Sequence, residues 1–258
     1  MNLYLKSKSL TITAVLCCCI SAPLLISGVP AEKPKSAAGR HILYLPADLV
    51  VKKSAASILS EEAYHLYESM KLKRAGLNRK VFEYAWKGYN NLLQSGKVRK
   101  AGILSICDFS QSSRRKRLYV IDVRAKKMLV NTYVAHGRNS GGEFANKFSN
   151  RPESHQSSLG FYVTRQTYFG GYGLALKIDG VERGINDRAN ERNIVVHGSH
   201  YIGEKFLRNN PFNGRSFGCP AIPAAQTPKV INSIKDGSCL FIYHPTKHYL
   251  TQSRILNG

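Results

Sequence analysis

Acidic residues are scarce in this chain. Asp and Glu together number 16 against 38 Lys and Arg, which gives a formal net charge of +22 over 258 residues. A surface this basic favours a polyanionic partner, such as nucleic acid, anionic lipid or an acidic cell-wall polymer. The alternative is that the charge is spread over solvated faces and mainly keeps the protein soluble.

Patterns that bind metals or phosphate groups are also missing. No spacing of His, Cys, Asp and Glu suggests a metal site, and no glycine-rich loop of the phosphate-cradling type occurs. The stretch FGGYG at 169–173 lacks the lysine and hydroxyl pattern of such a loop and indicates a flexible turn. We therefore expect neither a metal nor a cofactor.

The N-terminal segment has no charge between Ser9 and Ala31, and Lys6 and Lys8 precede it. This is the layout of an export signal, and its prolines and small residues favour removal near residues 28–31. Left uncleaved, the stretch is long enough to span a bilayer. We interpret residues 1–31 as a signal peptide or, alternatively, an N-terminal anchor that tethers the protein to a membrane. Export makes nucleic acid the least expected polyanion.

Cysteine is rare outside this leader. Three of the six cysteines lie in it, which leaves Cys107, Cys219 and Cys239 for an oxidising compartment. Because three is odd, at least one thiol is free. The simplest hypothesis is a possible disulfide between Cys107 and Cys239 with Cys219 free. The alternative is that both are unpaired core residues, since both flank apolar runs.

The remaining chain divides by its hydrophobic periodicity. Residues 32–55 show no lasting period and indicate a linker. Helical spacing then predicts a small helical hairpin over 56–100, with a first helix behind Ser60-Glu61-Glu62 and a second that Asn78 caps.

From residue 103 the period becomes two. Apolar runs such as RLYVIDV, GFYVTRQTY and CLFIYH alternate with Gly, Asn, Asp and Ser. This pattern predicts a mainly antiparallel β domain over 101–248, followed by a C-terminal tail at 249–258. The fold class is thus mainly β with a small N-terminal helical hairpin, and α+β overall.

One thiol has the surroundings of a nucleophile. Cys219, in GRSFGCPAIP, follows Gly218, which would let the backbone approach a substrate. A thiol attacks carbonyls as the thiolate and needs a base nearby. His197 ends the β-branched run NIVV and is followed by Gly198, a placement that suits a base. His136 ends a strand in the same way, as a substrate contact or as a structural loop histidine.

The stretch VVHGSHYIGEKFLRNNPFNGRSFGCPAIP resembles the signature of the murein L,D-transpeptidase (YkuD-like) catalytic domain, in which His-Gly is followed by a loop and Ser-x-Gly-Cys. The upstream stretches ICDFSQSSRRKRLYVIDV, VAHGRNSGGEFANKFSN and SSLGFYVT resemble the branch of that family whose motif ends in Ser-x-Gly-Cys-Pro. The resemblance covers about residues 56–245 and implies a YkuD-like β-sandwich or barrel as catalytic domain.

The resemblance implies a role for each matched residue. Cys219 matches the nucleophile that attacks a stem tetrapeptide of peptidoglycan at diaminopimelate, expels D-alanine and becomes acylated. His197 matches the general base, and the Gly198 carbonyl would orient it. The N–H groups of Gly218 and Cys219 would hold the oxyanion, and Ser216 matches the motif serine.

Three residues in the matched stretches are candidate substrate contacts, namely His136, Ser140 and Arg215. The implied partners are peptidoglycan stem peptides, and the implied location is the periplasm or cell envelope of a bacterium. An acidic murein mesh would also suit a basic surface.

The motif departs from better-known members of the family at two places. They carry a histidine or lysine before Gly-Cys and an arginine shortly after the cysteine, where this chain has Phe217 and Pro220-Ala221-Ile222. The acceptor of the acyl group is therefore open. The chain is predicted to be an L,D-transpeptidase; the alternatives are an L,D-carboxypeptidase that trims tetrapeptides to tripeptides, and a non-catalytic basic module that binds the cell wall.

Overall fold

A computed structural model describes residues 54–257. The predicted leader (1–31) and nearly all of the predicted linker (32–55) lie outside the described residues. Within residues 54–257, no helix has both the length and the apolar character needed to cross a membrane.

Two helices open the described chain, as the periodicity predicts. Helix α1 (Ala55–Ser69) begins earlier than expected, because the Ser54 side chain rather than Ser60 accepts the capping bond, from the Ser57 N–H. A short 3-10 turn, η1 (Leu72–Ala75), follows α1. Helix α2 (Arg79–Gln94) begins where predicted, and the Asn78 side chain accepts from the Lys80 N–H.

Within residues 54–257, eight strands form one sheet. They are β1 (Ile103–Asp108), β2 (Leu118–Asp122), β3 (Lys127–Thr132), β4 (Gly160–Gly170), β5 (Gly173–Gly180), β6 (Val195–Ser199), β7 (Ala221–Pro223) and β8 (Cys239–Tyr243). The order across the sheet is β3-β2-β1-β8-β4-β5-β6-β7. Pairing is antiparallel except at β1–β8 and β6–β7, which are parallel.

The two edges of this sheet approach each other. Ala135, just beyond β3, forms an antiparallel bridge with Ala221 of β7, and its N–H donates to the Ala221 carbonyl at 2.8 Å. Gly137 bridges Ser216 beside it. The sheet is therefore nearly closed into a barrel. The predicted fold class, mainly β with an N-terminal helical hairpin, is confirmed.

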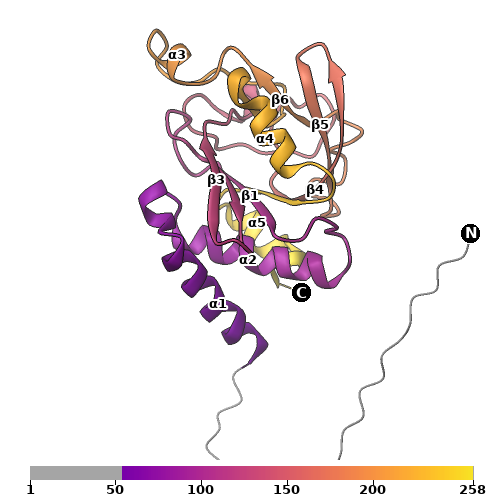
Figure 1. The fold of residues 1–258 in the computed structure, drawn as a ribbon. Coiled ribbons are helices and arrows are strands. Elements are labelled where there is room, and N and C mark those ends of the chain that lie inside the picture. Colours follow the sequence, from indigo (N-terminus) through magenta and orange to yellow (C-terminus); the bar gives the residue numbers. More distant parts are fainter. Residues whose placement is uncertain (1–53, 258) are drawn as a thin grey trace, which may run out of the picture. The chain divides into compact units, whose positions relative to one another are not determined.

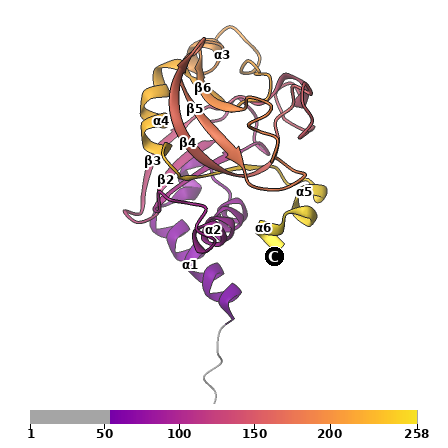
Figure 2. The ribbon, with the colours of Figure 1, turned by 90° about the vertical axis from the view of Figure 1, so that its right-hand side faces the viewer.

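Helices cover the sheet from several sides. Helix α2 packs on β1 and β8 (Figure 1), while α4 (Thr227–Ile234) covers another part of the sheet, against β1 and β5. The segment predicted as a C-terminal tail lies partly in α5 (Lys247–Gln252) and in α6 (Arg254–Asn257), and α6 contacts α2 (Figure 2). The hairpin helices and the sheet share one hydrophobic core.

The C-terminal helices are fixed by a buried carboxylate. Glu182 accepts hydrogen bonds from the Phe161 N–H at 2.7 Å, from the Tyr249 hydroxyl at 3.2 Å and from the Ser253 hydroxyl. Burial raises the pKa of Glu182, and these donors oppose that rise. The segment after α4 is thus tied to β4 through one side chain.

The possible disulfide between Cys107 and Cys239 is not formed, and both are buried free thiols. Their strands are neighbours, but the parallel register sets Cys239 opposite Leu104 and Cys107 opposite Ile242. An offset of three residues corresponds to about 10 Å along a strand, which is too far for a disulfide. Burial raises the pKa of Cys107 to about 12, so this thiol is an unreactive part of the core.

Candidate active site

Cys219 lies on the loop that leads into β7. The preceding residue, Gly218, has φ +124°, and a side chain at this position would meet the Gln156 carbonyl oxygen at 2.8 Å. Ser216 closes the turn, because its hydroxyl donates to the Cys219 carbonyl at 2.6 Å and accepts from the Gly218 N–H at 3.1 Å. Glycine and serine at these positions therefore fix the backbone of the cysteine.

Backbone groups at the start of β6 and just before it contact the thiol. The Val195 N–H donates to Cys219 Sγ at 3.5 Å, and Sγ lies 3.7 Å from the Asn193 carbonyl, to which its S–H donates. Burial raises the pKa of the Cys219 thiol; the Val195 N–H and the Arg192 guanidinium act in the opposite direction. The resting state is therefore a neutral thiol held at the junction of β6 and β7.

His197 lies on β6 at the same junction. The strand register sets it between Ala175 of β5 and Ala221 of β7, and Ala221 is two residues after the cysteine. Its Nδ1 lies 3.0 Å from the Gly198 carbonyl oxygen, so Nδ1 carries the proton and Nε2 is left as the acceptor. Burial lowers the pKa of His197, which keeps the imidazole neutral and able to take a proton.

Close neighbours restrict both the backbone after His197 and its imidazole ring. A side chain at Gly198 would meet the Thr227 hydroxyl oxygen at 2.2 Å, so only glycine fits between β6 and the start of α4. The Tyr172 ring, at the tip of the β4–β5 hairpin, lies against the imidazole with 4.8 Å between ring centroids. Tyr172 is 67% exposed, and Phe169 on the same tip is 84% exposed.

Two cavities flank the junction. One, of about 570 Å³, extends from Tyr172 past Gly198 and His200 to Thr227. The other, of about 340 Å³, is lined by Tyr168, Lys177, Asn193 and Val195 among others. A larger cavity of about 880 Å³ lies between α2 and the C-terminal helices and includes neither Cys219 nor His197. Like the larger cavity, these two are not lined by Cys219 or His197 themselves; they meet the end and the start of β6, the strand that carries His197.

The oxyanion donors implied by the resemblance differ in availability. The Gly218 N–H is engaged by Ser216, as described above. The Cys219 N–H lowers the pKa of its own thiol and so favours the thiolate. The structure therefore places Ser216 as a support of the turn and leaves the Cys219 N–H closer to the reacting atoms.

The candidate substrate contacts occupy different places. His136 is fully buried, with Nδ1 2.7 Å from an Arg117 nitrogen, and its carbonyl accepts from the Ser216 N–H. Ser140 is also fully buried, and its hydroxyl accepts from the Ser157 N–H. Neither side chain is accessible to a substrate. Of the two roles predicted for His136, the structural loop histidine therefore agrees with the structure. Arg215 is exposed and donates to the Gly141 carbonyl at 3.1 Å.

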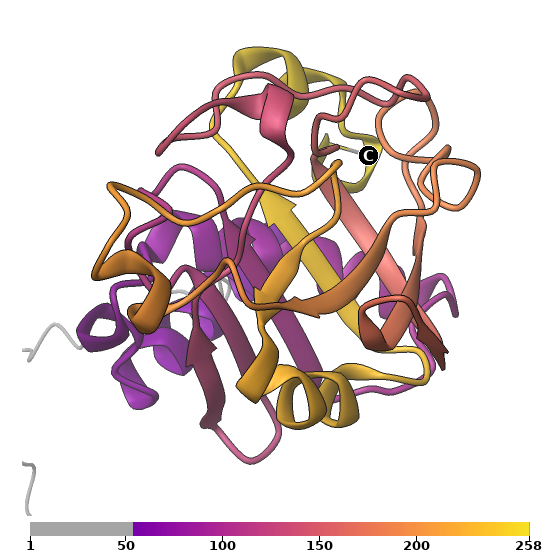
Figure 3. The ribbon, with the colours of Figure 1, turned by 90° about the horizontal axis from the view of Figure 1, so that it is seen from above.

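The unusual Phe217 lies on the rim beside the cysteine. It is 59% exposed, and its ring packs on His155 at 4.6 Å between centroids and beneath the Arg138 guanidinium at 4.8 Å. Seen from above (Figure 3), the loops around this rim face the viewer and α1 and α2 lie on the far side. An apolar ring with an arginine beside it replaces the polar residue of better-known relatives.

Residues that the sequence analysis did not single out complete the site. Arg192, Asn193 and Tyr172 all lie next to the thiol or the imidazole. The local sequence around these residues does not predict a place in the site, because their contacts join segments far apart in the chain. In residues 54–257, no group of three or more His, Cys, Asp or Glu residues could hold a metal ion.

The model of the L,D-transpeptidase catalytic domain family (YkuD_2) matches residues 73–243, more than half of the chain. The chain therefore belongs to the L,D-transpeptidase catalytic domain family. Among curated proteins, none matches it.

Solved structures resemble the chain more distantly. The helical cell shape determining protein Pgp2 from Campylobacter jejuni is 15% identical with a TM-score of 0.35, covering 62% of this chain and 57% of its own. An L,D-transpeptidase from Mycobacterium tuberculosis H37Rv is 14% identical with a TM-score of 0.33, covering 55% and 58%. The L,D-transpeptidase LdtMt1 in complex with imipenem is 9% identical with a TM-score of 0.34, covering 55% and 59%.

The chain thus spans less than two thirds of the length of these solved structures. At such identities and TM-scores the likeness carries no argument about residues or reaction.

Proposed function

We propose that this protein is a cysteine-dependent murein L,D-transpeptidase that acts on stem tetrapeptides of peptidoglycan. The observation that carries the proposal is the junction of β6 and β7, where Cys219 and His197 lie on paired chain segments in a chain of this family. The Nδ1–Gly198 contact leaves Nε2 free to act as the base.

The proposed reaction has two steps. His197 takes the thiol proton, and the Cys219 thiolate attacks the amide carbonyl after the L-configured centre of diaminopimelate. The amide bond breaks, D-alanine leaves with the proton from His197, and a thioester to Cys219 remains. An amine of a second stem then attacks the thioester, so that the two diaminopimelate residues become linked and the thiol is restored.

The two flanking cavities support transfer to a second stem. A transpeptidase has to hold a donor and an acceptor, and one hollow lies at each end of β6, the strand that carries His197. If water were the acceptor instead, the same acyl-enzyme would make the protein an L,D-carboxypeptidase. A basic wall-binding module without catalysis would need neither cavity.

The test uses the chain without residues 1–31 and a disaccharide-tetrapeptide. We expect release of D-alanine, an acyl adduct on Cys219 by intact mass, and dimers among the products. Cys219→Ala should abolish release, whereas Cys107→Ala, which changes a buried thiol in the core, should keep the reaction in the folded fraction. Tripeptides without dimers would establish the carboxypeptidase, and release that survives Cys219→Ala would refute the dyad.

We also propose that the protein works outside the cytoplasm, in the periplasm or cell envelope. The uncharged leader behind two lysines supports this location. Fractionation of cells that make the full chain, with N-terminal sequencing of the product, tests it: a mature protein that begins near residue 31 is expected, and a full-length protein in the cytoplasmic fraction would overturn it.

A further inference from the structure

Arg192 is a half-buried cation beside the nucleophile. It lies three residues before Val195, whose N–H donates to the sulfur, and directly before Asn193, whose carbonyl accepts from the S–H. One of its terminal nitrogens would be 3.2 Å from a side chain at Gly218. Its guanidinium therefore contacts the turn that carries Cys219.

Four hydrogen bonds lock this side chain in place. One terminal nitrogen donates to the Ser149 carbonyl at 2.8 Å and to the Ser158 hydroxyl at 2.5 Å. The other donates to the Gln156 carbonyl at 2.6 Å and to the Ser154 hydroxyl at 3.2 Å. All four acceptors are neutral and belong to the segment 149–158.

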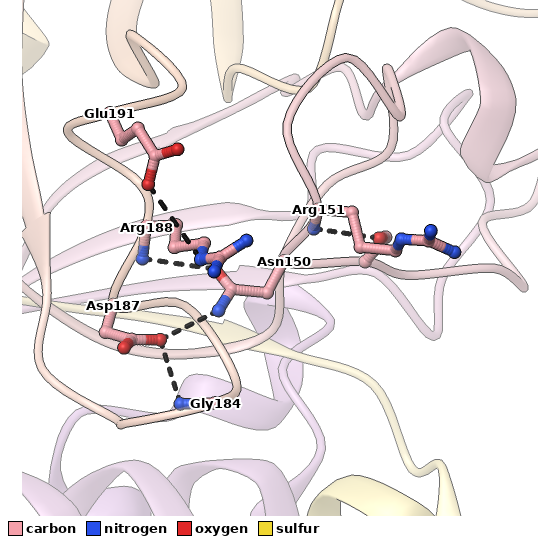
Figure 4. Close-up of polar contacts among 7 residues, drawn as sticks. Asn150, Arg151, Gly184, Asp187, Arg188 and Glu191 are labelled. Carbon is pink, nitrogen blue, oxygen red and sulfur yellow. Dashed lines mark hydrogen bonds and ion pairs between the residues drawn. The ribbon is translucent and has the colours of Figure 1, made fainter.

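A second set of contacts joins the segment 149–158 to the loop before β6, which carries Arg192. The Asn150 amide donates to Asp187 at 2.7 Å and its oxygen accepts from the Arg188 N–H at 3.2 Å, while Asp187 accepts from the Gly184 N–H at 2.8 Å (Figure 4). These bonds dock the loop before β6 onto the segment 149–158. Arg192 is thus held in place by its own bonds and by the loop around it.

Arg192 is not neutralised. In residues 54–257, no carboxylate pairs with it, and its Nε is buried without a hydrogen-bond partner. Removing a cation from water without a counter-charge is costly. Burial lowers the pKa of Arg192, and the groups that favour its charge are Tyr162 and Cys219. Of these two, only the cysteine becomes an anion during the proposed reaction.

We propose that Arg192 is a positioning residue whose fixed positive charge stabilises the Cys219 thiolate while its hydrogen bonds hold the segment 149–158 against the nucleophile turn. The proposal rests on the proposed function for its role in turnover, but the charge effect itself is a property of the free thiol. When His197 takes the thiol proton, the anion forms beside a guanidinium that needs no rearrangement. The cost of burying Arg192 is offset in that state.

The test measures alkylation of Cys219 by iodoacetamide as a function of pH, which needs no peptidoglycan. Among residues 54–257, Arg192 and Tyr201 are the charged or titratable groups that interact with the thiol, and His197 lies at the same strand junction, opposite Ala221. In Arg192→Gln we expect the midpoint of the pH profile to rise by about one unit, hence about tenfold slower alkylation at pH 7. Arg192→Lys, which keeps the charge, should restore most of the rate while its melting temperature falls, because an ammonium cannot replace the four bonds.

Arg188→Gln is the matched control, since this arginine belongs to the same loop, is exposed and, within the described part of the chain, forms an ion pair with Glu191 alone. Its profile should match that of the unchanged protein. An unchanged profile in Arg192→Gln, or equal shifts in the Gln and Lys variants, would overturn the proposal. If the unchanged protein releases no D-alanine but the Arg192→Gln profile still shifts, the proposed function fails and the charge effect stands.

Discussion

At the scale of single residues, the site rests on buried groups whose charge state is set by their surroundings. Arg117 is fully buried, contacts His136 Nδ1 and lies over the Phe109 ring at 4.8 Å. Because the guanidinium is a donor, Nδ1 must accept, and the imidazole is neutral. Burial lowers the pKa of His136 to about 3, and Arg117 acts in the same direction.

This shift predicts a pH dependence of stability. The ordinary pKa of the histidine is 6.5, so between pH 6.5 and about 3 the unfolded chain binds a proton at His136 that the folded chain does not. The free energy of unfolding should therefore decrease as the pH is lowered through this window, by up to about 1.4 kcal/mol per pH unit from this residue. Urea unfolding between pH 7.5 and 4 measures it. His136→Gln should be less stable at pH 7.5 but show a shallower slope, and parallel slopes would assign the effect to another group.

The two residues of the proposed dyad stand out in the sequence, whereas the residues that contact them do not. Cys219 and His197 stand in a motif that is local in sequence, with glycines that mark close backbone approach. Arg192 acts through acceptors more than thirty residues away, and Arg117 through a histidine on another segment. No local pattern encodes such contacts. The possible disulfide failed for the same reason, since register between β1 and β8 cannot be read from either strand alone.

Among the elements, helix α2 packs very closely on the sheet. Gly88 faces Phe161 of β4, and a side chain at Gly88 would lie 2.0 Å from the Phe161 ring. Phe161 in turn stacks on Phe241 of β8 with 4.1 Å between centroids. The helix can pack this closely only because glycine interrupts its apolar face.

Gly88→Ala should therefore destabilise the protein, although alanine is the better helix former. The added methyl has to displace either the ring or the helix, and overpacking of this kind costs about 1–3 kcal/mol. Chemical unfolding followed by circular dichroism measures the loss. Gly171→Ala is the control, because nothing lies within 4 Å of a side chain there. A Gly88→Ala protein as stable as the control would mean that α2 is free to shift on the sheet.

Elements with a strong period were predicted better than short ones. The longer strands are apolar runs of at least five residues, and α2 has a cap that the sequence shows. Strand β7 has only three residues and ends in proline, so no alternation could reveal it. Yet β7 closes the barrel through Ala221 and carries the turn with Cys219, and its place depends on tertiary pairing with β6.

Across the whole molecule, Lys and Arg greatly outnumber Asp and Glu, by 38 to 16. The described ion pairs lie at exposed positions, such as Lys116–Glu204 and Arg79–Glu83, and such pairs contribute little to stability. The rim cations Arg138 and Arg215 lie near the turn that carries Cys219. Charge of one sign around a site raises the local concentration of an anionic substrate.

This excess predicts that attachment to the wall depends on salt while the chemistry does not. In co-sedimentation with purified sacculi, we expect the bound fraction of the chain without residues 1–31 to fall steeply between about 0.05 and 0.5 M NaCl, because screening shortens from above 10 Å to a few ångströms. D-alanine release from a soluble disaccharide-tetrapeptide should change much less, since the half-buried Arg192 beside Cys219 is poorly screened. Sacculi with amidated carboxylates serve as the control and should bind weakly at every salt concentration. Binding that is insensitive to both salt and amidation would mean that the charge serves solubility, and that wall recognition lies in the cavities beside Cys219 and His197.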